Sequence, residues 1–163
     1  MTRIGLLSDT HAYWDDRYSD FFSNCDEIWH AGDIGSMSII DKLGASGKTM
    51  RAVYGNIDGQ DIRQTFPLHN RFLIEQVAVW LTHIGGYPKK YNPAIVGELK
   101  LNPPKLFICG HSHIAKVMYD NTLQLLHINP GAAGNQGFHA VRTLMRFVID
   151  KDVIKDLEII ELT

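Results

Sequence analysis

Five short apolar runs of the sequence each lead into a side chain that can bind a metal ion. The runs cover residues 4–7, 28–29, 52–54, 77–81 and 106–109. The side chains that follow them are Asp9, Asp33, Asn56, His83 and His111. Carboxylate, imidazole and amide groups without thiolate suit Mn, Fe, Zn or Ni better than a structural zinc centre. Because ligands bind at the carboxyl ends of buried strands in α/β sheets, the five side chains are predicted to converge on one metal site.

Two more histidines stand close to members of this set. In Asp9-Thr10-His11 and in His111-Ser112-His113, the two candidate ligands are two residues apart. Side chains at this spacing lie on one side of an extended segment, so each pair is predicted to approach one metal centre. Two ions about 3.5–4 Å apart can share a bridging carboxylate and clamp the attacking and leaving oxygens at phosphorus. Seven ligands are about what two such ions need.

Glycines flank these candidate ligands. A glycine comes directly before Asp33, Asn56 and His111, and the pair Gly85-Gly86 follows His83. An absent side chain lets the backbone pack closely around an ion or a phosphate. The loops at the strand ends are therefore predicted to be tightly packed.

The elements that would hold these loops alternate in type. Residues 15–22 and 36–43 have helix character, and Ser36 suits an N-cap. Beyond residue 114, turn signals separate strand-like runs at residues 117–119, 123–128, 141–149 and 153–162. These last runs predict an antiparallel meander. The whole pattern predicts an α/β fold, a two-sheet sandwich flanked by helices, in one domain over residues 1–163.

Composition narrows the classes of function and location. The 16 Lys and Arg residues nearly balance the 18 Asp and Glu residues, without a basic block, so a long nucleic acid is not expected as a partner. Cys25 and Cys109 lack metal-binding or disulfide spacing and are predicted to be reduced core residues. No apolar run approaches the length of about 18 residues that spans a membrane, and no signal segment precedes the first strand. We therefore expect a cytoplasmic protein without a membrane partner, and a homo-oligomer stays open.

The ordered motifs resemble those of the calcineurin-like metallophosphoesterases, in particular a compact prokaryotic subgroup. The resemblance runs from residue 4 to about residue 133 and includes Asn129-Pro130-Gly131-Ala132, which is similar to an Asn-Pro-Gly-Ser segment of that subgroup. It rests on the motifs Asp9-Thr10-His11, Gly32-Asp33, Gly55-Asn56, His83 and Gly110-His111-Ser112-His113.

The resemblance implies a four-layer αββα fold and two divalent metal ions, with manganese as the first candidate and iron, zinc or nickel as alternatives. One ion would be held by Asp9, His11, Asp33 and His113. The other would be held by Asp33, Asn56, His83 and His111. Asp33 would bridge the ions, Asn56 would also reach the substrate phosphate, and a metal-bridging hydroxide would be the nucleophile.

One position departs from the family pattern. Many members place a histidine after the motif asparagine, and this chain has Ile57 there. Asp58 follows, as in much of the compact subgroup. Two catalytic roles for Asp58 stay open, orienting a ligand or protonating the leaving group.

These observations favour a phosphodiesterase that hydrolyses small phosphodiesters, because a good leaving group lessens the need for a protein acid. One alternative is a phosphomonoesterase, including a protein phosphatase, which would more often keep the histidine. Another is a non-catalytic scaffold, because the family includes a retromer subunit of this size with an impaired metal site. Here every ligand position holds a usable ligand.

Other polar and aromatic residues match no motif. His30 fits a residue that orients a ligand as well as a core histidine, while a structural role is favoured for His69, His127 and His139. Tyr13 and Trp14 suit either stacking on a substrate or packing. The loop from Tyr87 to Tyr91 is predicted to be solvated, with substrate specificity as the alternative.

Overall fold

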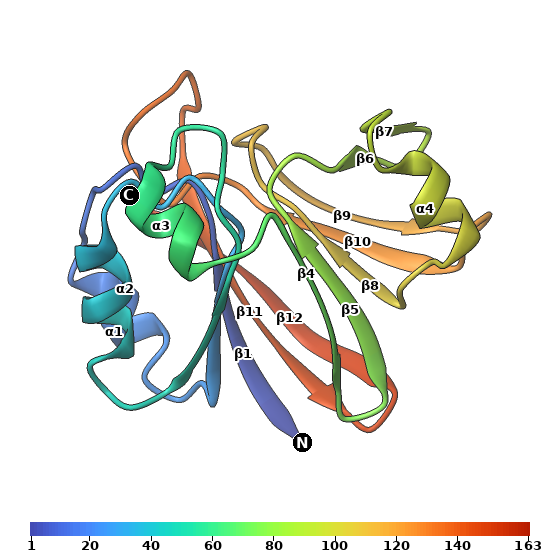
Figure 1. Cartoon of the computed structure of the whole chain (residues 1–163). Coiled ribbons are helices and arrows are strands. Elements are labelled where there is room, and N and C mark those ends of the chain that lie inside the picture. Colours follow the sequence, from blue (N-terminus) through green and yellow to red (C-terminus); the bar gives the residue numbers. More distant parts are fainter.

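The computed structural model describes residues 1–163 and contains two five-stranded sheets packed face to face (Figure 1). The first sheet has the order β12-β11-β1-β2-β3, in which β1, β2 and β3 are parallel and β11 is antiparallel to both neighbours. Its strands are β1 (Thr2–Leu7), β2 (Glu27–His30), β3 (Thr49–Ala52), β11 (Arg142–Asp150) and β12 (Val153–Leu162).

The second sheet has the order β4-β5-β8-β10-β9. Its central strands β5, β8 and β10 are parallel, and the edge strands β4 and β9 are antiparallel to them. Its strands are β4 (His69–Ile74), β5 (Val77–Thr82), β8 (Leu106–Ile108), β9 (Ala115–Asp120) and β10 (Leu125–Pro130). A small separate hairpin consists of β6 (Gly86–Tyr87) and β7 (Lys90–Tyr91).

Helices cover the outer face of each sheet. The helices are α1 (Arg17–Phe21), α2 (Met37–Gly44), α3 (Gln60–Thr65) and α4 (Val96–Leu101). Figure 1 shows α1, α2 and α3 beside the first sheet and α4 beside the second. One apolar cluster fills the space between the sheets, and two others join α1–α3 and α4 to their sheets. The predicted two-sheet α/β sandwich flanked by helices is confirmed, and its four layers match the expected αββα arrangement.

The apolar runs are continuous because both faces of the central strands are buried. In β1, Ile4 and Leu6 point between the sheets, while Leu7 packs with the helix layer. Gly5 points to the same layer, where the Phe22 ring occupies the space that a side chain would need. Because side chains alternate along a strand, successive residues of β1 pack between the sheets and against the helix layer in turn.

Both predicted helices are present in shortened or shifted form. Residues 15–22 yield α1, and residues 36–43 yield α2, whose N-cap Ser36 accepts a hydrogen bond from Ser38 N at 3.2 Å. The buried residues Ile39 and Leu43 are one helical turn apart and face the first sheet. The sequence pattern did not predict α3, α4 or β4. None of the helices is long and apolar enough to cross a membrane.

The four strands after residue 114 are present, but the predicted meander is wrong. β9 and β10 form a hairpin in the second sheet, whereas β11 and β12 form a hairpin in the first. Alternating apolar residues indicate a strand but not its partner. Here β10 pairs with β8 and β11 pairs with β1, so residues 131–141 cross from one sheet to the other.

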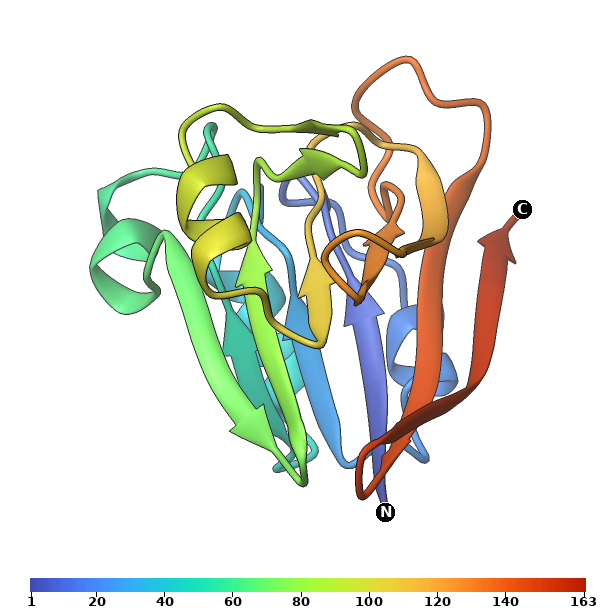
Figure 2. The ribbon, with the colours of Figure 1, turned by 90° about the vertical axis from the view of Figure 1, so that its right-hand side faces the viewer.

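The crossing lies at the edge of the sandwich where the parallel strands end. Figure 2 shows the arrowheads of β1, β5 and β8 directed to the same edge. The crossing segment bonds to the loop after β1 through Ala133 N to Ser8 O at 2.9 Å and Gly134 N to Asp9 O at 3.0 Å. The fold thereby gathers the loops that carry the candidate ligands.

Candidate metal centre

The loops after the strands hold the candidate ligands with unusual backbone geometry. A positive φ is found at Asp9 (55°), His11 (46°), Asp33 (53°), His111 (69°) and His113 (63°). Such left-handed conformations cost about 1–3 kcal/mol each for a residue with a side chain, and they cluster at functional sites. The expectation of extended backbone at Asp9-Thr10-His11 and His111-Ser112-His113 is therefore wrong, because both segments turn.

The side chains form two triads. Asp9, His11 and His113 make one, and Asp33, His83 and His111 make the other, with the ligand atoms of each triad within 4.8 Å of one another. Asp9 and His11 share a triad as their spacing predicted. His111 and His113 are divided between the triads, because the turn between them directs their rings to different places. The spacing alone allowed one shared centre for this pair, whereas the observed division agrees with the two ligand sets that the resemblance implies.

Asp9 presents one bare oxygen to the centre. Its Oδ2 accepts hydrogen bonds from Ser8 Oγ at 2.6 Å and His111 N at 3.0 Å. Its Oδ1 has no hydrogen-bond partner and lies 3.1 Å from His113 Nε2 and 3.8 Å from His11 Nε2.

A divalent cation fits this arrangement. Asp9 Oδ1 and His11 Nε2 are both buried without a hydrogen-bond partner, and such groups are rare because each loses its hydration without compensation. Carboxylate oxygen and imidazole nitrogen are also the donors that divalent transition metals prefer. The two orphaned atoms thus have the position and chemistry of metal ligands.

Asp33, a member of the second triad, also faces the first. Its Oδ1 accepts a hydrogen bond from Ile57 N at 3.0 Å. Its Oδ2 lies 3.4 Å from His11 Nε2, a member of the first triad, and 3.2 Å from His83 Nε2, a member of the second. One oxygen of Asp33 therefore faces both groups of ligands.

Asn56 joins the second triad through its amide oxygen. Asn56 Oδ1 lies 3.1 Å from His83 Nε2 and 3.0 Å from His111 Nδ1. His83 Nδ1 donates to Ala31 O at 2.7 Å, so the neutral ring carries its proton on Nδ1 and leaves Nε2 free to bind a cation.

The electrostatics of the centre favour a cation. Burial opposes ionisation of Asp9 and Asp33, but the neighbouring imidazoles outweigh burial and lower the pKa of both carboxyls. Asp9 in turn raises the pKa of His11, and Asp33 raises that of His83 against the effect of burial. The two carboxylates stay charged at neutral pH, and the His11 and His83 rings beside them favour a bound proton or a cation.

Asp58 holds the loops together. Its Oδ2 accepts from Gly55 N at 2.8 Å and Ile34 N at 3.1 Å, and its Oδ1 accepts from Gly35 N at 2.8 Å. Only 4% of the residue is exposed. Because both oxygens are bonded to backbone amides, a catalytic role as proton donor does not fit, whereas the role of orienting the ligand loops does.

Glycines are required where ligands pack against backbone. A methyl group on Gly55 would overlap Asp33, and a methyl group on Gly110 would overlap the Ser8 hydroxyl that supports Asp9. These contacts agree with the predicted tight packing of the loops.

Histidines outside the ligand set differ in their roles. His30 is fully buried and joins the two ligand loops, because its Nε2 lies 3.0 Å from Thr10 Oγ1 and its Nδ1 accepts from Gly32 N at 3.1 Å. Burial lowers the pKa of His30 to about 3, as expected for a neutral core histidine. His69 Nδ1 lies 2.9 Å from Thr82 Oγ1, and His127 Nε2 lies 3.0 Å from Gly86 O.

His139 is different, because its Nδ1 lies 3.2 Å from His113 Nδ1. A structural role was favoured for this residue from the sequence. The one signal for it was its place in a glycine-containing segment shortly after the motif-like Asn129-Pro130-Gly131.

The aromatic and cysteine residues have packing roles. Tyr13 stacks on Arg142, and Trp14 meets the Tyr18 ring edge-on at 5.4 Å. Cys25 and Cys109 are buried and unpaired, as predicted. Burial raises the pKa of the Cys109 thiol to about 12, which rules against a nucleophilic role.

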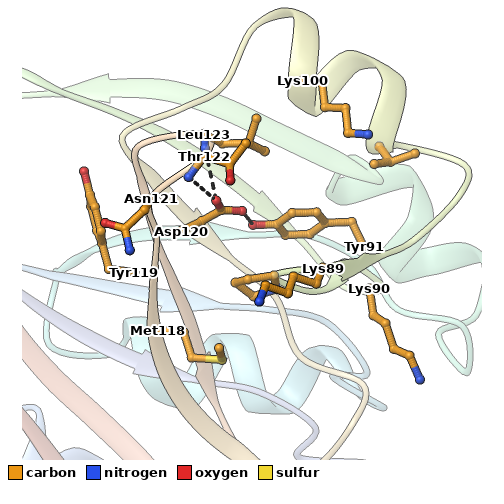
Figure 3. Close-up of a pocket in the computed structure, with 12 residues that line it drawn as sticks. Lys89, Lys90, Tyr91, Lys100, Met118, Tyr119, Asp120, Asn121, Thr122 and Leu123 are labelled. Atoms are coloured by element: carbon orange, nitrogen blue, oxygen red, sulfur yellow. Dashed lines mark hydrogen bonds between the residues drawn. The ribbon is translucent and has the colours of Figure 1, made fainter.

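The loop after His83 shapes a separate pocket. Lys89, Lys90 and Tyr91 line a cavity of about 720 Å³ that none of the candidate metal ligands borders. Figure 3 shows the Tyr91 ring directed to Asp120, whose Oδ2 accepts its hydroxyl at 2.6 Å. This cavity opens beside α4 and the turn between β9 and β10, away from the triads.

A second cavity of about 350 Å³ does border the centre. Asn56 and His83 form part of its wall, together with apolar side chains such as Tyr54, Leu68 and Ile84. A small organic group therefore has room beside the second triad.

The chain is similar in sequence to one known superfamily. A model of the calcineurin-like phosphoesterase superfamily domain matches residues 2–152. A probable metallophosphoesterase of Methanocaldococcus jannaschii is 31% identical over 140 residues, which cover 79% of this chain and 67% of that protein.

Two solved structures share the fold. An archaeal phosphodiesterase superposes with a TM-score of 0.79 at 22% identity, covering 98% of this chain and 99% of the other. Vps29 of Chaetomium thermophilum superposes with a TM-score of 0.77 at 11% identity, covering 99% of this chain and 97% of the other. At these identities, each superposition establishes similarity of fold alone.

Proposed function

Because this chain belongs to the calcineurin-like phosphoesterase superfamily, whose members use divalent metals, we propose that it is a metal-dependent phosphodiesterase acting on small phosphodiesters. The observation that carries the proposal is the pair of candidate ligand triads, in which Asp33 Oδ2 of the second triad also faces His11 of the first. Manganese is the proposed metal, with iron, zinc or nickel as alternatives.

The candidate ligands form two sets, one for each proposed metal ion. Asp33 would be shared between the two ions. The remaining ligands would be Asp9, His11 and His113 for one ion and Asn56, His83 and His111 for the other. Two ions held there would supply positive charge to the phosphate and activate a water for attack on phosphorus.

Asn56 has a second role in this proposal. Its Oδ1 faces His83 and His111, so its Nδ2 group remains free to donate a hydrogen bond to a phosphate oxygen. The residue is exposed and therefore accessible to substrate.

Two features favour a diester over a monoester. A diester carries a second organic group, and the cavity of about 350 Å³ beside Asn56 and His83 has room for one. In addition, the exposed side chain of Ile57 has no proton to give a leaving group. Hydrolysis would then be fastest for leaving groups that depart without protonation.

The test uses protein freed of metal by chelation and then supplied with Mn²⁺. We expect hydrolysis to require added metal and to be faster on bis(p-nitrophenyl) phosphate than on p-nitrophenyl phosphate. Asp9→Asn should abolish it, whereas Asp41→Asn, an exposed position on α2, should not. Faster monoester hydrolysis would favour a phosphomonoesterase. A purified protein with neither bound metal nor activity on any diester with Mn²⁺ would favour the scaffold.

A further inference from the structure

The segment between β10 and β11 folds a histidine back onto the metal centre. The segment appears in orange at the top of Figure 2. Gly134 N donates to Asp9 O at 3.0 Å, and Gly134 O lies 2.8 Å from His139 Nε2. The same backbone residue therefore contacts a ligand loop and fixes the His139 ring.

The contacts of His139 determine where its proton lies. A carbonyl oxygen only accepts hydrogen bonds, so the bond to Gly134 O places a proton on His139 Nε2. A neutral His139 then has a bare Nδ1. That atom lies 3.2 Å from His113 Nδ1, so the hydrogen bond between the rings needs a proton on His113 Nδ1.

The chain of hydrogen bonds ends at the centre. With its proton on Nδ1, a neutral His113 has its lone pair on Nε2, which lies 3.1 Å from the orphaned Asp9 Oδ1. Two electron-rich atoms this close repel each other unless a cation lies between or beside them. This arrangement of protons is therefore the one that suits metal binding.

Packing fixes the orientation of the His113 and His139 rings relative to each other. Their centroids are 5.1 Å apart at an interplanar angle of 77°. Gly137, at φ +120°, lies against both rings, and a methyl group there would overlap the His113 ring and approach His139 Nδ1 to 3.3 Å. The backbone leaves no room for either ring to turn away on that side.

We propose that His139 is a positioning residue that holds His113 with its proton on Nδ1 and so directs His113 Nε2 to the metal. The inference rests on the proposed function only in taking His113 as a metal ligand. Partners of this kind typically change metal affinity by about 10–100-fold when they are removed.

The first test is a Zn²⁺ titration of metal-free protein. His139→Leu should weaken binding at one of the two sites by about 10–100-fold. His139→Asn keeps an acceptor near the position of Nδ1 and should recover part of the loss. His139→Gln keeps only a donor near the position of Nε2 and should recover little. Phe138→Ala, a fully exposed neighbour in the same segment, should bind like the unsubstituted chain.

Two titration results would overturn the inference. One is His139→Leu binding Zn²⁺ as tightly as the unsubstituted chain. The other is recovery by His139→Gln but not by His139→Asn, which would show that the bond to Gly134 and not the bond to His113 matters.

A second test needs no substitution and therefore holds even if His139→Leu fails to fold. In Zn²⁺-loaded protein with ¹⁵N-labelled histidine, NMR should show coupling across a hydrogen bond between His113 Nδ1 and His139 Nδ1. Absence of this coupling, or a proton on His139 Nδ1, would overturn the inference. Neither test uses a substrate. A protein that passes both but hydrolyses no diester would contradict the proposed function alone.

Discussion

Asp58→Asn tests whether Asp58 supports the loops or donates a proton. The native carboxylate accepts three hydrogen bonds from backbone amides, two at Oδ2 and one at Oδ1. An asparagine can keep its oxygen at the position of the two bonds. Its amide group then faces Gly35 N, which loses its acceptor in a buried site.

The expected loss follows from these bonds. A hydrogen bond to a charged acceptor contributes about 1.5–3 kcal/mol, and the other two bonds also weaken when the charge is removed. We therefore expect the free energy of unfolding to fall by about 3 kcal/mol, within the total of about 5–15 kcal/mol typical of a domain. The variant should still fold.

The assay is urea unfolding of metal-free protein, because a bound metal adds stability of its own. Asp41→Asn is the matched control, since Asp41 is exposed on α2. The dependence of rate on leaving-group pKa should be the same in Asp58→Asn as in the unsubstituted chain. An unchanged stability together with a steeper leaving-group dependence would refute the reasoning and identify Asp58 as the acid.

Three further outcomes follow from the centre. Excess Mn²⁺ should restore the activity of His113→Ala at least in part by mass action. It should restore that of Asn56→Ala less, because metal cannot replace a phosphate contact. Equal recovery of activity in metal titrations would contradict the second role of Asn56. The unsubstituted chain should lose rate steeply from nitrophenyl to alkyl diesters, and Ile57→His should flatten that trend through general acid catalysis, which contributes about 10²–10⁴-fold. Gly55→Ala should weaken metal binding at least tenfold, because the new methyl group displaces Asp33. Gly59→Ala should not weaken it, since the methyl group there meets only Asp61 at 3.5 Å. Equal metal affinities of the two variants by calorimetry would contradict the argument that Gly55 leaves room for Asp33.

The sequence predicted the strand ends well because burial on both faces leaves an uninterrupted apolar run. It also predicted that ligands from different strands meet, since parallel strands share a carboxyl edge. It did not predict strand partners, so β10 and β11 were placed side by side although they lie in different sheets. Alternating apolar residues identify the buried face of a strand. Which strand pairs with it depends on contacts between residues far apart in the sequence.

The errors in predicting the site from the sequence also arise because local patterns do not report contacts between distant parts of the chain. Two-residue spacing implies a shared side only for extended backbone, and the positive φ angles of His111 and His113 remove that condition. His139 was missed because its partner His113 is 26 residues away in sequence. A lone histidine in a loop has no pattern that reveals such a contact.

The candidate ligands come from both sheets, so a metal ion bound there would also hold the two sheets together. Asp9 and Asp33 follow strands of the first sheet, whereas His83 and His111 follow strands of the second. An ion bound by residues of both sheets would link the sheets at the open edge of the sandwich, where the His83 bond to Ala31 O already joins them. Amide hydrogen exchange near this edge should therefore slow on loading, while the β11–β12 turn at residues 151–152 should exchange as before.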